Sequence, residues 1–133
     1  MSPDPAIELE RVRDMVLALP GTIEKVSHGA PVFFIDGARG RSFAWFWHNH
    51  HGDGRTALLV KTSGLEEQEM LIEADPDLYF KPPYLGPSGW IGVLLDQDST
   101  DWHHIADWIE RSWRSVAPRK LLEGWNGGDA EGT

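Results

Sequence analysis

The sequence has no cysteine among its 133 residues, so disulfide frameworks, thiolate metal sites and cysteine nucleophiles are excluded. It also has no apolar run near the roughly 20 residues that a membrane-spanning helix needs. Residues 1–5 contain neither a basic region nor an apolar run, unlike a secretory signal. We therefore expect a cytoplasmic protein that does not enter a membrane.

Basic residues are scarce, with 12 Lys and Arg against 21 Asp and Glu, and the formal net charge is −9. This balance argues against a general nucleic-acid binder, because such proteins usually present a basic field. The charges are also unevenly distributed. The segment 66–110 holds eleven acidic residues and one basic residue, whereas 111–120 holds four basic residues and no acid.

The length predicts one domain, expected over residues 1–125, which can bury a core without disulfide or metal staples. The seven tryptophans are expected to pack between helices and a sheet. Residues 126–133 are rich in glycine and acid, and we expect them to form a disordered tail.

Hydrophobic periodicity predicts the order helix, four strands, helix, strand, helix. The strands are expected at 24–28, 32–35, 42–47, 56–61 and 90–95, with a brief extension at 78–80. The helices are expected at 5–19, at 65–74 and from Trp102 until Pro118 breaks the last one. Hairpin connections imply an antiparallel sheet, and helices on one face would make a two-layer α+β sandwich.

Two helix starts carry capping signals. Ser63 and Glu66 have the spacing of a capping box before the second helix. Ser99, Thr100 and Asp101 offer a cap and a first-turn acid for the last helix.

Three segments together carry a family resemblance. Residues 82–96 read PPYLGPSGWIGVLLD, the Trp-rich helix after them ends in APRKL at 117–121, and LPG stands at 19–21. This order resembles the MmcQ/YjbR family of small bacterial proteins over about residues 9–122. The resemblance implies a two-layer sandwich related in shape to CyaY-like domains and type III secretion chaperones. It also implies DNA binding, although GPSG at 86–89 stands where relatives commonly have a polar pair, and this removes a basic side chain.

The best candidate for DNA binding is the basic end of the chain. Arg111 and Arg114 are three residues apart and therefore neighbours on one helix face, and Arg119 and Lys120 follow Pro118. Such a patch could contact phosphates without reading sequence.

Two other basic residues are possible contributors to DNA binding, Lys61 at the end of a predicted strand and Arg55 before it. The alternative for the basic end is structural. Cations near a helix C-terminus stabilise the helix dipole, and here they could also pair with Asp107 and Glu110.

A second hypothesis is a protein-interaction module that uses the acidic, aromatic-rich surface. Strand alternation places Trp45 and Trp47 on one sheet face and Phe46 on the other, so a helix layer or a partner must cover one of them. A third hypothesis is a small-molecule site near Tyr84 and Trp90, whose rings could stack on a ligand.

Catalysis and metal binding find little support in the residue pattern. His48, His50, His51 and Asp53 could suit zinc, but they meet no known ligand spacing and also fit a polar hairpin tip. No nucleophile, base and acid stand in a recognisable arrangement, and no phosphate-binding glycine motif occurs. We expect no enzymatic activity, no cofactor and no metal.

Overall fold

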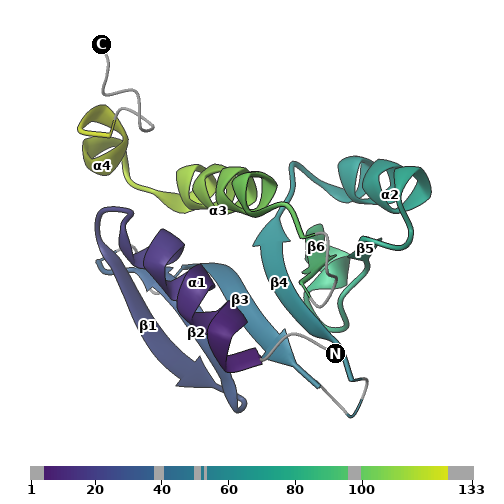
Figure 1. Ribbon diagram of the computed structural model, residues 1–133. Helices are drawn as coiled ribbons and strands as arrows, with labels where there is room; N and C mark the ends of the chain where they lie inside the picture. Colours follow the sequence, from purple (N-terminus) through teal and green to yellow (C-terminus); the bar gives the residue numbers. More distant parts are fainter. Residues whose placement is uncertain (1–4, 38–40, 50–51, 53, 96–99, 126–133) are drawn as a thin grey trace.

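Six strands form one sheet in the order β1-β2-β3-β4-β6-β5, and every neighbouring pair is antiparallel (Figure 1). The structure is a computed structural model that describes residues 5–37, 41–49, 52, 54–95 and 100–125. The predicted tail at 126–133 lies outside these residues. The strands are β1 (Thr22–Ser27), β2 (Ala30–Ile35), β3 (Ser42–His48), β4 (Thr56–Lys61), β5 (Tyr79–Phe80) and β6 (Trp90–Leu94).

The helices are α1 (Pro5–Leu17), α2 (Leu65–Ala74), α3 (Trp102–Val116) and α4 (Arg119–Glu123), with a short 3₁₀ helix, η2 (Gly86–Ser88), before β6. All four α-helices pack on one face of the sheet, as the sequence predicted. The α+β sandwich is therefore confirmed. The observed order adds β5 and α4 to the predicted elements.

The main core lies between this helix layer and the sheet. Ile105, Ile109 and Trp113 of α3 recur every four residues and are almost fully buried, as their helical spacing predicted. They meet inward residues of the strands, including Phe46 and Leu58.

One buried hydroxyl fixes α3 to two strands. Ser112 has no exposed surface, and its Oγ donates to the Phe43 carbonyl at 2.5 Å. The same oxygen accepts the Lys61 backbone N–H at 2.9 Å. Because both hydrogen-bonding roles of the hydroxyl are used, α3 has a defined register on β3 and β4.

The opposite sheet face carries a second hydrophobic cluster. Its buried members include Trp47, Leu59 and Trp90, and Leu85 from the Pro-rich loop packs against them. We call this the aromatic face; it also carries Phe34, Trp45 and Phe80, which are partly exposed. Phe46 points into the helix layer instead, so the predicted separation of Trp45 and Trp47 from Phe46 is observed.

Local capping agrees with the sequence at one helix and differs at another. Asp101 caps α3, and its Oδ1 accepts the backbone N–H groups of His103 and His104. The predicted capping box of Ser63 and Glu66 is wrong, because Gly64 is the N-cap of α2 and makes no side-chain cap bond. The carboxylate of Glu67, one residue later than predicted, accepts the Ser63 N–H at 2.8 Å.

The short helix α4 was not predicted. Pro118 does end α3, but it also serves as the N-cap of α4, where the missing N–H has no cost. Across the described residues, every helix is too short or too polar to traverse a bilayer.

Candidate functional site

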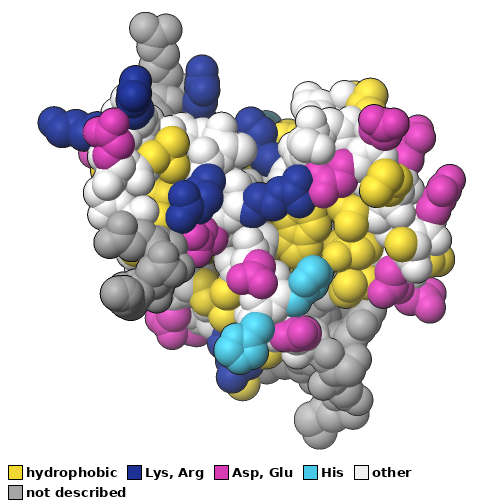
Figure 2. Space-filling model, turned by 90° about the horizontal axis from the view of Figure 1, so that it is seen from above, with side chains coloured by type: hydrophobic (Ala, Val, Ile, Leu, Met, Phe, Trp, Pro, Cys, Tyr) yellow, Lys and Arg dark blue, Asp and Glu magenta, His cyan; other side chains and the backbone are white. Residues whose placement is uncertain are grey.

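The four basic residues predicted to bind DNA lie at the end of α3 and in α4. On the helical side of the molecule, basic side chains are spread out and acidic side chains stand beside several of them (Figure 2). Ion pairs explain this pattern. Arg111, Arg114 and Arg119 each bind a glutamate within the chain.

Arg111 is the most constrained of these residues. Its guanidinium forms a two-pronged pair with Glu67 of α2, with Nη1 at 2.8 Å from Oε2 and Nη2 on Oε1. It also lies 4.9 Å from the centre of the Trp108 ring. The hydrogen bonds from Arg111 lower the pKa of Glu67 to about 2, although burial works in the other direction. Arg111 therefore holds α2 to α3.

The other two arginines pair locally. Arg114 Nη2 lies 2.9 Å from Glu110 Oε2, the same oxygen that accepts the Trp125 indole N–H at 3.2 Å. Arg119 Nε lies 3.1 Å from Glu123 Oε2 at a highly exposed position. The predicted pairing with Glu110 is thus observed, and each of the three arginines has its charge balanced by a carboxylate.

Lys120 is exposed and makes no ion pair with any residue that the structure describes.

Arg55 and Lys61 lie away from this patch. They flank β4 at opposite ends, and both fall on the aromatic face, because Lys61 pairs with Trp90 and Arg55 lies over the Phe80 ring. The six predicted residues therefore divide into two groups on opposite sides of the sheet.

The aromatic face brings cations and rings together. The Arg55 guanidinium lies 5.1 Å from the centre of the Phe80 ring, and Lys25 Nζ lies 5.6 Å from the centre of the Phe34 ring. Trp45 lies between them, on the central strand β3. This spacing alternates positive charge with flat apolar surface across the sheet.

A glycine makes the Phe80 position possible. Phe80 and Gly92 are direct partners in the β5–β6 pair. A Cβ added at position 92 would lie 2.3 Å from Phe80 Cζ, so only glycine lets the ring lie flat over β6.

Acidic side chains are absent from this face of the six described strands. Their single acid, Glu24, pairs with Phe33 and points into the helix layer. There both of its oxygens accept hydrogen bonds from Arg13 of α1, at 2.7 and 2.8 Å. The charged strand residues of the aromatic face are therefore all cations, namely Lys25 and Lys61, with Arg55 immediately before β4.

Sequence reasoning missed Lys25, Phe34 and Phe80 as members of one surface. Lys25 follows Glu24 in the first predicted strand, and consecutive strand residues point to opposite faces of a sheet, so the sequence did indicate that these two side chains are separated. The pairing of β5 with β6 had no such signal, because a two-residue strand leaves no periodicity.

The proposed ligand residues Tyr84 and Trp90 differ in exposure. Tyr84 is 75% exposed in the Pro-rich loop and has a positive φ of 69°. Trp90 is 6% exposed within the second cluster. A shared small-molecule site stays a prediction, which this arrangement does not strengthen.

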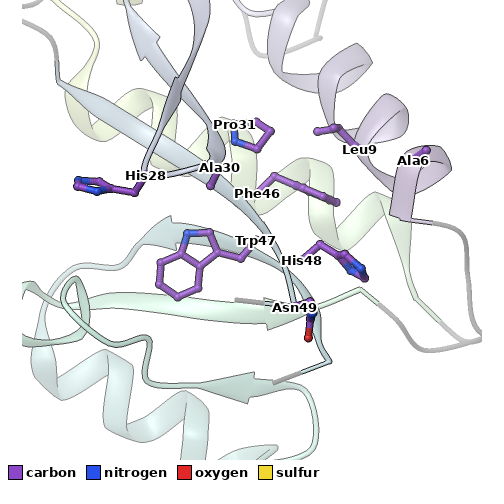
Figure 3. A pocket seen from close by; sticks show the side chains of 10 residues that line it. Ala6, Leu9, His28, Ala30, Pro31, Phe46, Trp47, His48 and Asn49 are labelled. Atoms are coloured by element: carbon purple, nitrogen blue, oxygen red, sulfur yellow. The ribbon is translucent and has the colours of Figure 1, made fainter. Parts of the chain in front are cut away.

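A hollow of about 540 Å³ lies where β3 ends beside α1 and the β1–β2 turn (Figure 3). Leu9, Pro31 and Phe46 line it, and His28 and His48 stand apart at its edge. His48 Nδ1 lies 2.9 Å from Thr56 Oγ1. Of the predicted histidine cluster, His50, His51 and Asp53 lie outside the described residues. Within the described part of the chain, no three His, Asp or Glu side chains are grouped to hold a metal.

Comparison with known proteins places this fold in a family. The crystal structure of the Deinococcus radiodurans protein DR2400, which carries the family-model domain DUF419, superposes with a TM-score of 0.70. The match covers 91% of this chain and 94% of that chain at 19% identity, so it shows a shared fold. No curated protein matches the sequence. The YjbR family model matches residues 17–115, which include all six strands of the sheet, α2 and all of α3 except Val116. The chain therefore belongs to the YjbR family.

Proposed function

We propose that this chain is a non-enzymatic domain that binds single-stranded nucleic acid weakly, without sequence preference, through its aromatic face. One observation carries the proposal. On this face the charged side chains of the described strands are all cations, and Lys25, together with Arg55 just before β4, lies over an aromatic ring of the sheet. The family resemblance of the sequence also implies DNA binding, which is the same ligand class.

Stacking platforms with cations are how single strands are bound without reading sequence. Every base has a flat face that can stack on a ring, while Lys and Arg follow the phosphates. Phe34, Trp45 and Phe80 are partly exposed and could supply the rings, with Lys25 and Arg55 moving from Phe34 and Phe80 to the phosphates. Lys25, Arg55 and Lys61 could supply the charge.

The location differs from the one expected from the sequence. A phosphate at Arg111, Arg114 or Arg119 would have to compete with a carboxylate already bound there. Lys25, in contrast, projects from the aromatic face on an exposed position of β1. The net charge of −9 opposes association, which is why we expect weak binding in the cytoplasm.

Fluorescence anisotropy tests the proposal with a labelled oligothymidine and a duplex of equal length, from 20 to 300 mM salt. We expect micromolar binding to the single strand at low salt. If three phosphates are neutralised, the logarithm of the association constant should fall with the logarithm of the salt concentration at a slope of roughly −2. The triple variant K25Q/R55Q/K61Q should bind at least about tenfold more weakly.

The matched control is R114Q/R119Q/K120Q, which removes three cations from the C-terminal patch and leaves the Arg111 pair intact. It should bind like the wild type. If it loses binding and the aromatic-face variant does not, the site is the C-terminal patch. No binding at 20 mM salt by the folded wild type would reject nucleic-acid binding.

A further inference from the structure

The outer side of α2 exposes two large apolar side chains. Leu65 is 51% exposed and Met70 is 63% exposed, among the most exposed large apolar residues described. They border a shallow hollow of about 510 Å³ that is lined by residues 63–67 and Met70. On the α2 side of Figure 2, hydrophobic side chains gather with acidic ones around them.

These two side chains do little for the packing of α2. The helix is anchored instead by Gln68, which is 2% exposed and donates to the carbonyls of Gly86 and Trp90 at 2.8 and 2.7 Å. Leu71 and Ile72 pack on the main core, while neither Leu65 nor Met70 belongs to either hydrophobic cluster. The exposed side chains of Leu65 and Met70 are therefore available to contact a partner.

The charge that α2 contributes to this hollow has one sign. The helix carries four glutamates and no basic residue, and Glu66, Glu69 and Glu73 are exposed. The neighbouring cation, Arg111, is already bound by Glu67. A partner therefore meets apolar surface within a negative rim.

We propose that the outer side of α2 docks a basic amphipathic segment of a partner protein. Leucine-sized side chains of the segment would fill the hollow beside Leu65 and Met70. Its Lys or Arg side chains would pair with Glu66, Glu69 and Glu73. Charge complementarity identifies the partner chemistry, because an acidic or neutral segment would leave the glutamates desolvated and unpaired.

A fluorescein-labelled amphipathic peptide of Leu and Lys, 16 residues long, serves as the probe in anisotropy titrations. The wild type should bind it at micromolar concentration. L65S/M70S keeps every charge and should weaken binding about tenfold. E66Q/E69Q/E73Q keeps the apolar pair and should remove most of the salt dependence.

Two controls separate this site from general attraction to an acidic protein. I7S removes a 62% exposed residue of α1, outside the hollow, and should bind like the wild type. Amide chemical-shift changes on peptide addition should centre on residues 63–73. The proposal is overturned if L65S/M70S binds as tightly as I7S, if the shifts scatter over the surface, or if no binding occurs.

This site is independent of the aromatic face. The K25Q/R55Q/K61Q variant should bind the peptide as the wild type does, and L65S/M70S should bind the oligonucleotide unchanged. Either proposal can therefore fail while the other stands.

Discussion

Phe80 lies across Gly92 so closely that a methyl group at position 92 would stand 2.3 Å from the ring. We predict that G92A destabilises the fold by about 1–3 kcal/mol, because the ring must leave its place on β6. Urea unfolding measures the loss. In an F80A background the clash is gone, so G92A should then cost clearly less. Equal costs in both backgrounds would show that the ring is not the cause.

The pair between Glu67 and Arg111 predicts a pH dependence. The pKa of Glu67 is lowered from 4.5 to about 2 in the folded protein, first by the Arg111 hydrogen bonds. Its stabilising effect is thus complete above pH 4.5 and is lost as the pH falls toward 2. Because the Arg111 side chain is 45% exposed, which weakens the ion pair, we expect E67Q to cost about 1–2 kcal/mol at pH 7.

Urea unfolding at pH 7 and at pH 3 tests this prediction. The difference between wild type and E67Q should be smaller at pH 3. E69Q, an exposed change on the same helix, should show almost no difference at either pH. An E67Q effect of equal size at both values would mean that the ion pair does not stabilise the fold.

Replacing Ser112 with alanine should destabilise the protein by about 1–3 kcal/mol. The change leaves the Lys61 N–H and the Phe43 carbonyl without their buried partner. The matched control is S115A, since Ser115 is exposed and bonds only locally to the Ser112 carbonyl. In thermal unfolding, the Tm of S112A should be several degrees below that of the wild type, and the Tm of S115A should be close to it. Similar Tm values for the two variants would contradict a stabilising role for the two Ser112 hydrogen bonds.

Gln68 offers a sharper chemical test. Its amide donates to two carbonyls, so Q68E would place a carboxylate against two acceptors in a buried site. We expect Q68E to cost more than Q68A, and to recover part of its stability at acidic pH as the carboxyl protonates. Guanidinium unfolding at pH 7 and pH 4 measures both effects, and a Q68E protein as stable as Q68A would refute the assignment.

The sequence predicted what depends on regular spacing. Ile105, Ile109 and Trp113 repeat at helical intervals, so α3 and its buried stripe followed directly. The partner of Arg111 could not be predicted this way, because Glu67 is 44 residues distant and meets it only when α2 packs near α3.

Short elements were harder to predict for the same reason: β5 was expected only as a brief extension at 78–80, and α4 was not expected. The strand β5 has two residues, and its position is set by pairing with β6. Helix α4 follows a proline that, in sequence, signals only an end. Only part of the candidate interface was therefore predicted from the sequence: Arg55 and Lys61 were named, and Lys25 and Phe80 were not.

The opposite placement of cations on the sheet and glutamates on α2 has a consequence for diffusion. Taken by themselves, these two groups of charges would turn the molecule as it approaches a polyanion. The sheet would arrive first, while α2 would face away into solution. The domain could then bind a nucleic-acid single strand on one side and the basic segment of a partner protein on the other. It would act as an adaptor between two oppositely charged molecules.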